Sequence, residues 1–159
     1  MIFLKDSQLN DNLAKRISES ALLTVKHGDR VNTMTVSWGG FGVLWGKEVC
    51  FVFVRPSRFT YGFCEGEDKF TLSFFGKERK KTLSYCGTKS GRDTDKIKDC
   101  DLSYSDGDGF VVFDDAQITL KLKKLYSDDI KKECFNDLSP LANYKDGDFH
   151  RMYVCEVLH

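Results

Sequence analysis

The apolar residues of this chain gather in stretches of strand length, separated by glycine and charged residues, and this pattern limits the fold most strongly. Alternation within short stretches is typical of β-strands, whereas an amphipathic helix repeats its apolar positions over several turns. The predicted strands cover residues 21–25, 31–37, 49–54, 70–75, 110–113, 118–125 and 152–158. Six or more strands with few helices favour a closed or split antiparallel β-barrel, so the predicted class is mainly β.

The expected helices are few and short. Leu9, Leu13 and Ile17 recur at a spacing of four, which predicts a helix over about residues 8–19 with Ser7 as its cap. No two long helical segments are present, as a doubly wound α/β fold would need. The other expected helices cover residues 57–65, 77–85 and 128–135, and glycines at 39, 40 and 42 interrupt the strand pattern.

Length and composition set the class of protein. The 159 residues are expected to form a single domain, residues 1–159. The chain has 13 Phe, 6 Tyr and 2 Trp, which suit a β-rich core and could also line a pocket for a flat ligand. A formal net charge of zero argues against a dedicated nucleic-acid binder.

Two further classes are not expected. No apolar run approaches the ~20 residues that span a bilayer. Residues 1–6 do not resemble a signal peptide, so we expect no membrane contact and a cytoplasmic location. The six cysteines include no C-x-x-C pair and lie away from the histidines, so no metal site is expected and the thiols are predicted to be free and mostly buried.

Charge is unevenly distributed in the middle of the chain. Residues 76–98 hold eight basic and three acidic residues, whereas residues 99–118 hold six aspartates and no basic residue. The basic stretch is either a solvated face or part of an anion site.

Residues 31–38 form the first segment that could carry chemistry. In an extended strand, alternation places Thr33, Thr35 and Ser37 on one face. Such a row of hydroxyls either meets the polar edge of a ligand or faces water at the edge of a sheet.

A corner between a strand and a helix forms the second segment. Arg55 and Arg58 flank Ser57 where the helix is expected to begin, and free N–H groups with two guanidinium groups make a plausible phosphate cradle. Solvated surface arginines are the alternative. The loop with Lys89 and Ser90 also suits an anion, although the G-x-x-x-x-G-K-[ST] and G-x-G-x-x-G patterns are absent. His150, before the last strand, is either structural or catalytic.

Five segments, taken together and in order, resemble the flavin reductase-like family of FMN-binding split-barrel proteins, which includes flavoredoxin-like members. They span residues 31–157. The segments read V-N-T-M-T-V-S-W, F-V-R-P-S-R-F-T-Y, F-T-L-S-F-F, Y-C-G-T-K-S-G-R-D-T-D-K and G-D-F-H-R-M-Y-V-C-E-V.

The resemblance implies a Greek-key split barrel with a few short helices, and a homodimer that binds FMN near its subunit interface. By position, Arg55, Ser57 and Arg58 would hold the phosphate, Lys89 and Ser90 would close the site, and His150 would lie near the flavin and the nicotinamide. The residues expected along the isoalloxazine and the ribityl chain are Asn32, Thr33, Met34, Thr35 and Ser37.

Two activities agree with this resemblance. The first is an NAD(P)H:flavin oxidoreductase, in which a hydride passes from the nicotinamide to the flavin and the protein orients the two rings. The second is a flavoredoxin-like electron-transfer protein that a redox protein partner reduces. Neither requires a nicotinamide-binding fingerprint, so the sequence leaves both open.

Overall fold

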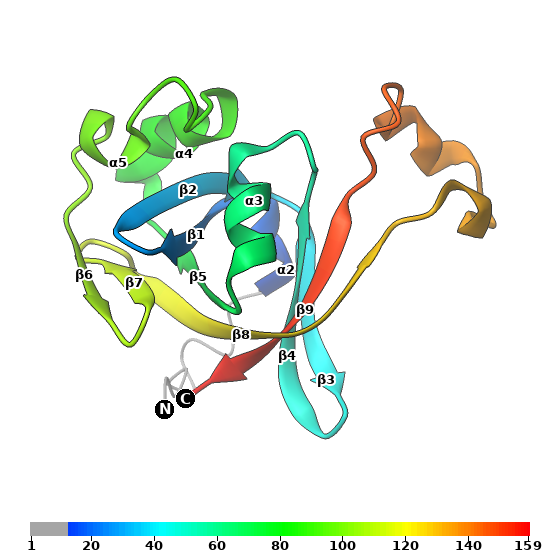
Figure 1. Cartoon of the computed structure of the whole chain (residues 1–159), viewed down its shortest axis with the longest axis horizontal. Helices are drawn as coiled ribbons and strands as arrows, with labels where there is room; N and C mark the ends of the chain where they lie inside the picture. Colours follow the sequence, from blue (N-terminus) through cyan, green and yellow to red (C-terminus); the bar gives the residue numbers. More distant parts are fainter. Residues whose placement is uncertain (1–12) are drawn as a thin grey trace.

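The computed structural model describes residues 13–159, and within them seven strands form one antiparallel sheet (Figure 1). The strand order across this sheet is β2-β1-β5-β8-β9-β4-β3. The strands are β1 (Ala21–His27), β2 (Arg30–Val36), β3 (Gly39–Leu44), β4 (Lys47–Val54), β5 (Lys69–Phe74), β8 (Ile118–Asp129) and β9 (Arg151–Leu158).

Shorter elements complete the described part of the chain. A separate ribbon pairs β6 (Tyr104–Gly107) with β7 (Phe110–Phe113). The α-helices are α2 (Leu13–Ser18), α3 (Phe59–Gly66), α4 (Lys80–Thr88) and α5 (Lys96–Asp99), and the 3-10 turns are η1 (Lys77–Arg79), η2 (Lys132–Cys134) and η3 (Ser139–Asn143).

The sheet is split between two strands that follow each other in the sequence. β2 and β3 form its two ends, and no pairing joins them in residues 13–159. Figure 1 shows β3, β4 and β9 on one side of α3 and β1 and β2 on the other. Among the strands of the seven-stranded sheet, β4 is followed along the chain by β5, β8 and β9. β9 then pairs with β4, which is Greek-key connectivity. The predicted mainly-β split barrel with short helices is confirmed.

The core lies on both faces of β1. Leu23 packs in the main core beneath α3, which includes Phe70 and Tyr153, while Leu22 packs in a smaller cluster under α4 with Leu83 and Cys86. Neighbouring residues of an extended strand point to opposite faces, so a strand covered by helices on both sides is apolar throughout. The four largest fully buried side chains are aromatic, as the composition predicts: Tyr153, Phe70, Phe74 and Phe113.

Two local predictions differ from the structure. The helix predicted over residues 128–135 is only partly present: η2 is a 3-10 helix over Lys132–Cys134, whereas β8 stays paired with β9 as far as Asp129 opposite Arg151. The glycines near residue 40 do not end the sheet but form β3. A Cβ on Gly39 would lie 2.7 Å from the carbonyl oxygen of Phe51, so the pairing requires a residue without one. Of the helix predicted over residues 8–19, α2 is described, while Ser7 and Leu9 lie outside the described residues.

One segment stands away from the barrel. Residues 130–150, which carry η2 and η3, form an arm between the ends of β8 and β9 (Figure 1). Arg55 fixes the base of this arm, because its guanidinium donates to the carbonyl oxygens of Asp148 and Asn143 at 3.0 and 2.8 Å. In the described part of the chain, no helix has the length and apolar character needed to cross a membrane.

Candidate functional site

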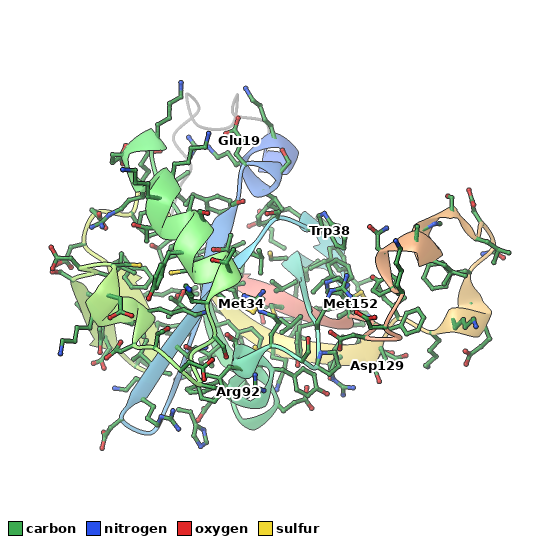
Figure 2. The ribbon with its side chains drawn as sticks, turned by 90° about the horizontal axis from the view of Figure 1, so that it is seen from above. Glu19, Met34, Trp38, Arg92, Asp129 and Met152 are labelled. Carbon is green, nitrogen blue, oxygen red and sulfur yellow. The ribbon has the colours of Figure 1, made fainter. Side chains whose placement is uncertain are left out.

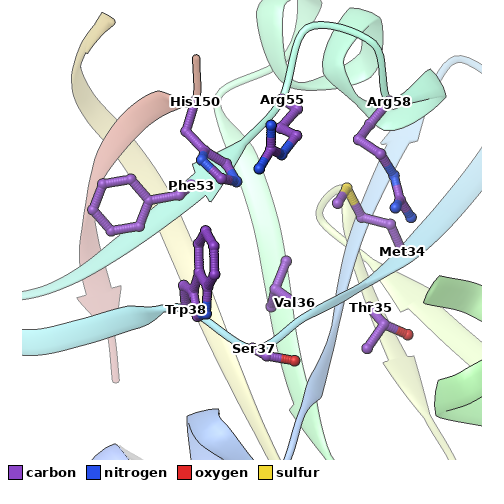
Figure 3. Close-up of a pocket in the computed structure, with 9 residues that line it drawn as sticks. All are labelled: Met34, Thr35, Val36, Ser37, Trp38, Phe53, Arg55, Arg58 and His150. Atoms are coloured by element: carbon purple, nitrogen blue, oxygen red, sulfur yellow. The ribbon is translucent and has the colours of Figure 1, made fainter. Parts of the chain in front are cut away.

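A cleft of about 320 Å³ opens at the split of the sheet (Figure 3). Its residues come from the end of β2, from β4, from the β4–α3 corner and from the residue before β9. This volume falls within the range of small-molecule pockets. The lining residues are Met34, Thr35, Val36, Ser37, Trp38, Phe53, Arg55, Arg58 and His150.

The cleft brings together some of the residues predicted for the site and leaves out others. Six predicted residues line it: Met34, Thr35, Ser37, Arg55, Arg58 and His150. The predicted residues that do not line it are Asn32, Thr33, Ser57, Lys89 and Ser90.

The hydroxyls of β2 are used within the fold. Thr33 Oγ1 lies 2.9 Å from Thr24 Oγ1 and donates to the carbonyl oxygen of Leu23 at 3.2 Å. Thr35 Oγ1 donates to the carbonyl oxygen of Leu83 in α4. Figure 3 shows the hydroxyls of Thr35 and Ser37 pointing away from His150. The opposite face of β2 therefore contributes its side chains to the cleft.

Met34 and Val36 form the β2 wall of the cleft. Both side chains are buried and lie on the face that looks toward Arg55 and Arg58 (Figure 3). Asn32 is on the same strand but is used elsewhere, because its amide donates to Thr60 Oγ1 at 2.7 Å. Of the residues predicted in segment 31–38, Met34, Thr35 and Ser37 line the cleft, and Asn32 and Thr33 do not.

The three residues of the predicted phosphate corner have different partners: Arg55 and Ser57 contact the arm, whereas Arg58 contacts α4. The hydroxyl and the backbone N–H of Ser57 both donate to the carboxylate of Asp148 at the base of the arm. Arg55 also points to the arm and lies over the ring of Tyr144, with 5.0 Å between its Cζ and the ring centroid. Arg58 instead donates to the carbonyl oxygen of Gly87 at 3.0 Å. Only Arg58 thus faces α4.

A second cation joins Arg58 at the end of α4. Lys96 is 3% exposed, and its Nζ donates to the carbonyl oxygens of Thr33 and Cys86 at 3.0 and 2.9 Å. Burial and the neighbouring Arg58 lower the pKa of Lys96 to about 8. Within residues 13–159, neither cation has a carboxylate partner within 4 Å, so positive charge remains at this end of the cleft. The basic excess in residues 76–98 was the available signal for Lys96.

The opposite end of the cleft is aromatic. The rings of Trp38 and His150 have centroids 5.3 Å apart, and Phe53 meets His150 at 6.3 Å. Trp38 is 51% exposed, so a large ring stands at the mouth of the cleft. Such rings can cover a flat ligand. Trp38 and Phe53 were not predicted as site residues, although each lies within a quoted family segment.

His150 is neutral at pH 7. Burial, with a smaller effect from the Arg55 charge, lowers the pKa of His150 to about 4 against the influence of Asp148. The Tyr144 hydroxyl lies 2.7 Å from Nδ1, and burial raises the pKa of that tyrosine. The two groups share one hydrogen bond whose direction follows from the tautomer of His150: Nδ1 accepts from the hydroxyl when the imidazole proton is on Nε2. In that tautomer Nε2 can donate one hydrogen bond.

Lys89 and Ser90 lie outside the cleft. Lys89 caps the end of α4, with its backbone N–H donating to the carbonyl oxygen of Tyr85. Ser90 Oγ accepts from the backbone N–H of Arg92 at 3.2 Å, which shapes the following turn.

The sequence of this chain matches a known protein family. Residues 16–159 match the model of the flavin reductase like domain. The match extends over most of the chain, and the chain belongs to this family. No curated protein sequence matches the chain.

Solved structures share the fold at low sequence identity. An FMN-binding protein from Thermus thermophilus, solved with p-hydroxybenzaldehyde, is 23% identical over 88% of this chain and 69% of its own, with a TM-score of 0.68. Flavoredoxin from Methanosarcina acetivorans is 18% identical over 88% and 66%, with a TM-score of 0.68. The styrene monooxygenase flavin reductase from Pseudomonas putida S12 is 13% identical over 88% and 76%, with a TM-score of 0.64.

Proposed function

We propose that this chain binds FMN in the cleft and acts as an NAD(P)H-dependent flavin reductase. The observation that carries the proposal is the polarity of the cleft, which has rings at one end and the Arg58 cation, with Lys96 buried beside it, at the other. FMN has a flat ring system at one end and a phosphate dianion at the other, so its chemistry matches this arrangement. Family membership and the FMN-binding protein among the similar structures support the same ligand.

The residues present fit each part of the cofactor. Trp38 and Phe53 would contact the ring system, the backbone of residues 35–37 would meet its polar edge, and Arg58 would hold the phosphate. FMN, when bound, supplies the hydride-accepting chemistry, which no side chain of the protein provides. A guanidinium suits a phosphate because its planar N–H fork donates two parallel hydrogen bonds.

The protein's own contribution at the aromatic end is a fixed hydrogen-bond donor. His150 stays neutral, and we propose that the Tyr144 hydroxyl donates to Nδ1 and so keeps the imidazole proton on Nε2. A neutral donor stabilises negative charge that develops on a nearby acceptor without requiring a proton transfer. Trp38 covers the mouth of the cleft and would limit the access of water.

Anaerobic mixing tests the proposal. Purified protein loaded with FMN is mixed with NADH or NADPH in a stopped-flow instrument, and the yellow absorbance of the oxidised flavin is followed. Rapid bleaching that saturates with dinucleotide concentration is expected. A protein that does not bind FMN, or that keeps its colour with both dinucleotides, contradicts the proposed activity.

Electron transfer from a redox protein partner is the second candidate function. The similar structures include flavoredoxins from Methanosarcina acetivorans and Desulfovibrio vulgaris, which favours this alternative. A protein of this kind would bleach only after a reduced partner protein is added. The same stopped-flow experiment therefore separates the two functions.

We also propose that the chain forms a homodimer. Trp45 and Tyr126 make a ring contact at 6.3 Å, and their exposed fractions are 59% and 45%. Val43, on the same hairpin as Trp45, is 75% exposed. Exposed rings and aliphatic groups clustered in this way are typical of a surface that a partner covers.

A further inference from the structure

A second hollow, of about 400 Å³, shares Arg58 with the cleft and is strongly cationic. We call it the arginine groove, after its lining residues Arg30, Arg58 and Arg92. His27 also lines it, whereas no carboxylate does so among the described residues. In the view of Figure 2, Met34 lies between Trp38 and Arg92, and Arg92 lines the groove but not the cleft.

Two of the arginines rest on the ring of Phe59. The Cζ atoms of Arg30 and Arg92 each lie 5.4 Å from its centroid. Phe59 in turn packs edge-on against Phe63 at 5.3 Å, which fixes the ring. Cation–π contact orients a guanidinium but does not consume its N–H donors. Both groups are therefore held in place and remain able to bind an anion.

The hydrogen bonds of the groove leave donors and charge available. Arg92 Nη1 donates to the carbonyl oxygen of Ser57 at 3.1 Å, and Arg58 donates to α4 carbonyls. The Arg30 guanidinium makes no hydrogen bond or ion pair with any residue in 13–159. Each guanidinium has five N–H donors, so most donors of the groove are free. Backbone carbonyls neutralise no charge, and three positive charges remain.

Rings and cations together select the class of ligand. A lone phosphate needs the cations but not the aromatic floor of Phe59 and Tyr61. A nucleotide needs both, because bases stack on aromatic rings and on guanidinium planes while their phosphates take bidentate hydrogen bonds. The groove also adjoins the end of the cleft where the flavin's phosphate is proposed to lie.

We propose that the arginine groove binds the phosphorylated adenosine part of the nicotinamide dinucleotide, and that it favours the form with a 2′-phosphate. This inference rests on the proposed flavin reductase function. Arg30 and Arg92 hold the phosphates. The Tyr61 ring and the outer faces of the guanidinium groups contact the base, because Arg30 and Arg92 already lie over the Phe59 ring. Arg58 stands between this ligand and FMN and belongs to both sites.

The experiment titrates 2′,5′-ADP, which lacks the nicotinamide, into the FMN-loaded protein by isothermal titration calorimetry. Arg30→Gln and Arg92→Gln are each expected to weaken its binding about 10-fold or more, because each removes charged hydrogen bonds. Arg30→Lys keeps the positive charge but not the parallel N–H donors of the guanidinium, so it should lose less affinity for 2′,5′-ADP. Lys81→Gln removes an exposed lysine of α4 and serves as the charge-matched control with unchanged affinity.

Three results overturn the proposal. The first is that 2′,5′-ADP does not bind the wild-type protein. The second is that Arg30→Gln and Arg92→Gln bind 2′,5′-ADP as the wild type does. The third is that both variants lose FMN affinity instead, which would assign the groove to the flavin's own phosphate. Thermal melts of each variant verify its fold, and Arg30 is exposed on a hairpin, where substitution leaves the core intact.

Failure of the proposed function gives a different pattern. The wild-type protein could bind 2′,5′-ADP through Arg30 and yet have its flavin reduced by neither NADH nor NADPH. That result would support the nucleotide site and refute the reductase activity. Both dinucleotides could instead reduce the flavin at equal rates, with the Arg30→Gln variant unaffected. That result would support the reductase activity and refute the nucleotide site in the arginine groove.

Discussion

The hydroxyl of Tyr144 lies 2.7 Å from Nδ1 of His150, and this contact joins the projecting arm to the aromatic end of the cleft. Tyr144 also stacks on Phe149, with 4.7 Å between ring centroids, and it accepts the Arg55 cation on its face. The arm is therefore more than a surface extension of the β8–β9 hairpin. It contacts and orients the one histidine in the cleft, whose pKa is lowered mainly by burial.

Tyr144→Phe tests this positioning role. The variant keeps the ring contacts and loses the hydrogen bond to Nδ1, so we expect flavin reduction to slow about 10-fold while FMN affinity stays nearly unchanged. The pH profile of the reduction rate should also shift, because Nδ1 of His150 loses its hydrogen-bond partner. His150→Ala should slow reduction at least as much. Parallel losses of FMN affinity and thermal stability, with an unaltered pH profile, would instead indicate a packing role.

The buried His150 also predicts a dependence of stability on pH. Its pKa is about 4 in the folded chain against the ordinary histidine value of 6.5, so the unfolded chain binds the proton more readily between these values. The stabilising contribution is complete above pH 6.5 and is lost as pH falls through 4. We expect the free energy of unfolding to decline by about 3 kcal/mol from this group across that window. Urea titrations of the wild type and His150→Gln at several pH values measure it. An equal dependence of the unfolding free energy on pH in both proteins would contradict the assignment.

Arg58 is predicted to distinguish flavins by their phosphate. Removing one charged hydrogen bond costs roughly 1.5–3 kcal/mol, so Arg58→Gln should weaken FMN about 10- to 150-fold. Riboflavin has no phosphate and should lose far less. Fluorescence quenching titrations with both flavins give the comparison. Because Arg58 also donates to α4 carbonyls, the variant's melting temperature is recorded alongside, and equal weakening of both flavins would remove Arg58 from the phosphate site.

Gly91 is predicted to be intolerant of a side chain. A Cβ at this position would lie 2.3 Å from Asn32 Oδ1 and 2.5 Å from Phe59 Cδ1. Both neighbours are held, Asn32 by its bond to Thr60 and Phe59 by Phe63. Gly91→Ala should therefore destabilise the protein by about 1–3 kcal/mol. Gly62→Ala, in α3, meets nothing within 4 Å and should be neutral or stabilising, which makes it the matched control in chemical denaturation.

The proposed homodimer predicts a mass of about 36 kDa, twice 18.2 kDa, in sedimentation equilibrium. Trp45→Lys places a charge on the exposed ring patch and should shift the population toward monomer. Lys81→Gln, on α4, should leave the mass unchanged. A wild-type monomer at micromolar concentration that binds FMN would show that the dimer is not needed for the site.

Local pattern was sufficient for most strands and for the position of the cleft along the chain. The alternation in β2 and the apolar run of β4 are encoded by neighbouring residues, so the split-barrel class was predictable. β3 was not, because glycine carries no apolar side chain to mark a face. The end of β8 was missed since its pairing partner, β9, lies more than twenty residues further along the chain.

The sequence by itself determined most of the strands, the family motifs and the presence of arginines at the β4–α3 corner. Only the tertiary structure decided which face of β2 lines the cleft, because that depends on α4, where the Leu83 carbonyl takes the Thr35 hydroxyl. Packing also separated Arg55 from Arg58 and buried Lys96 beside the latter. Residues that are close in sequence share a strand or a corner, but the direction of each side chain is set by partners distant in the chain, and single-sequence patterns do not contain those contacts.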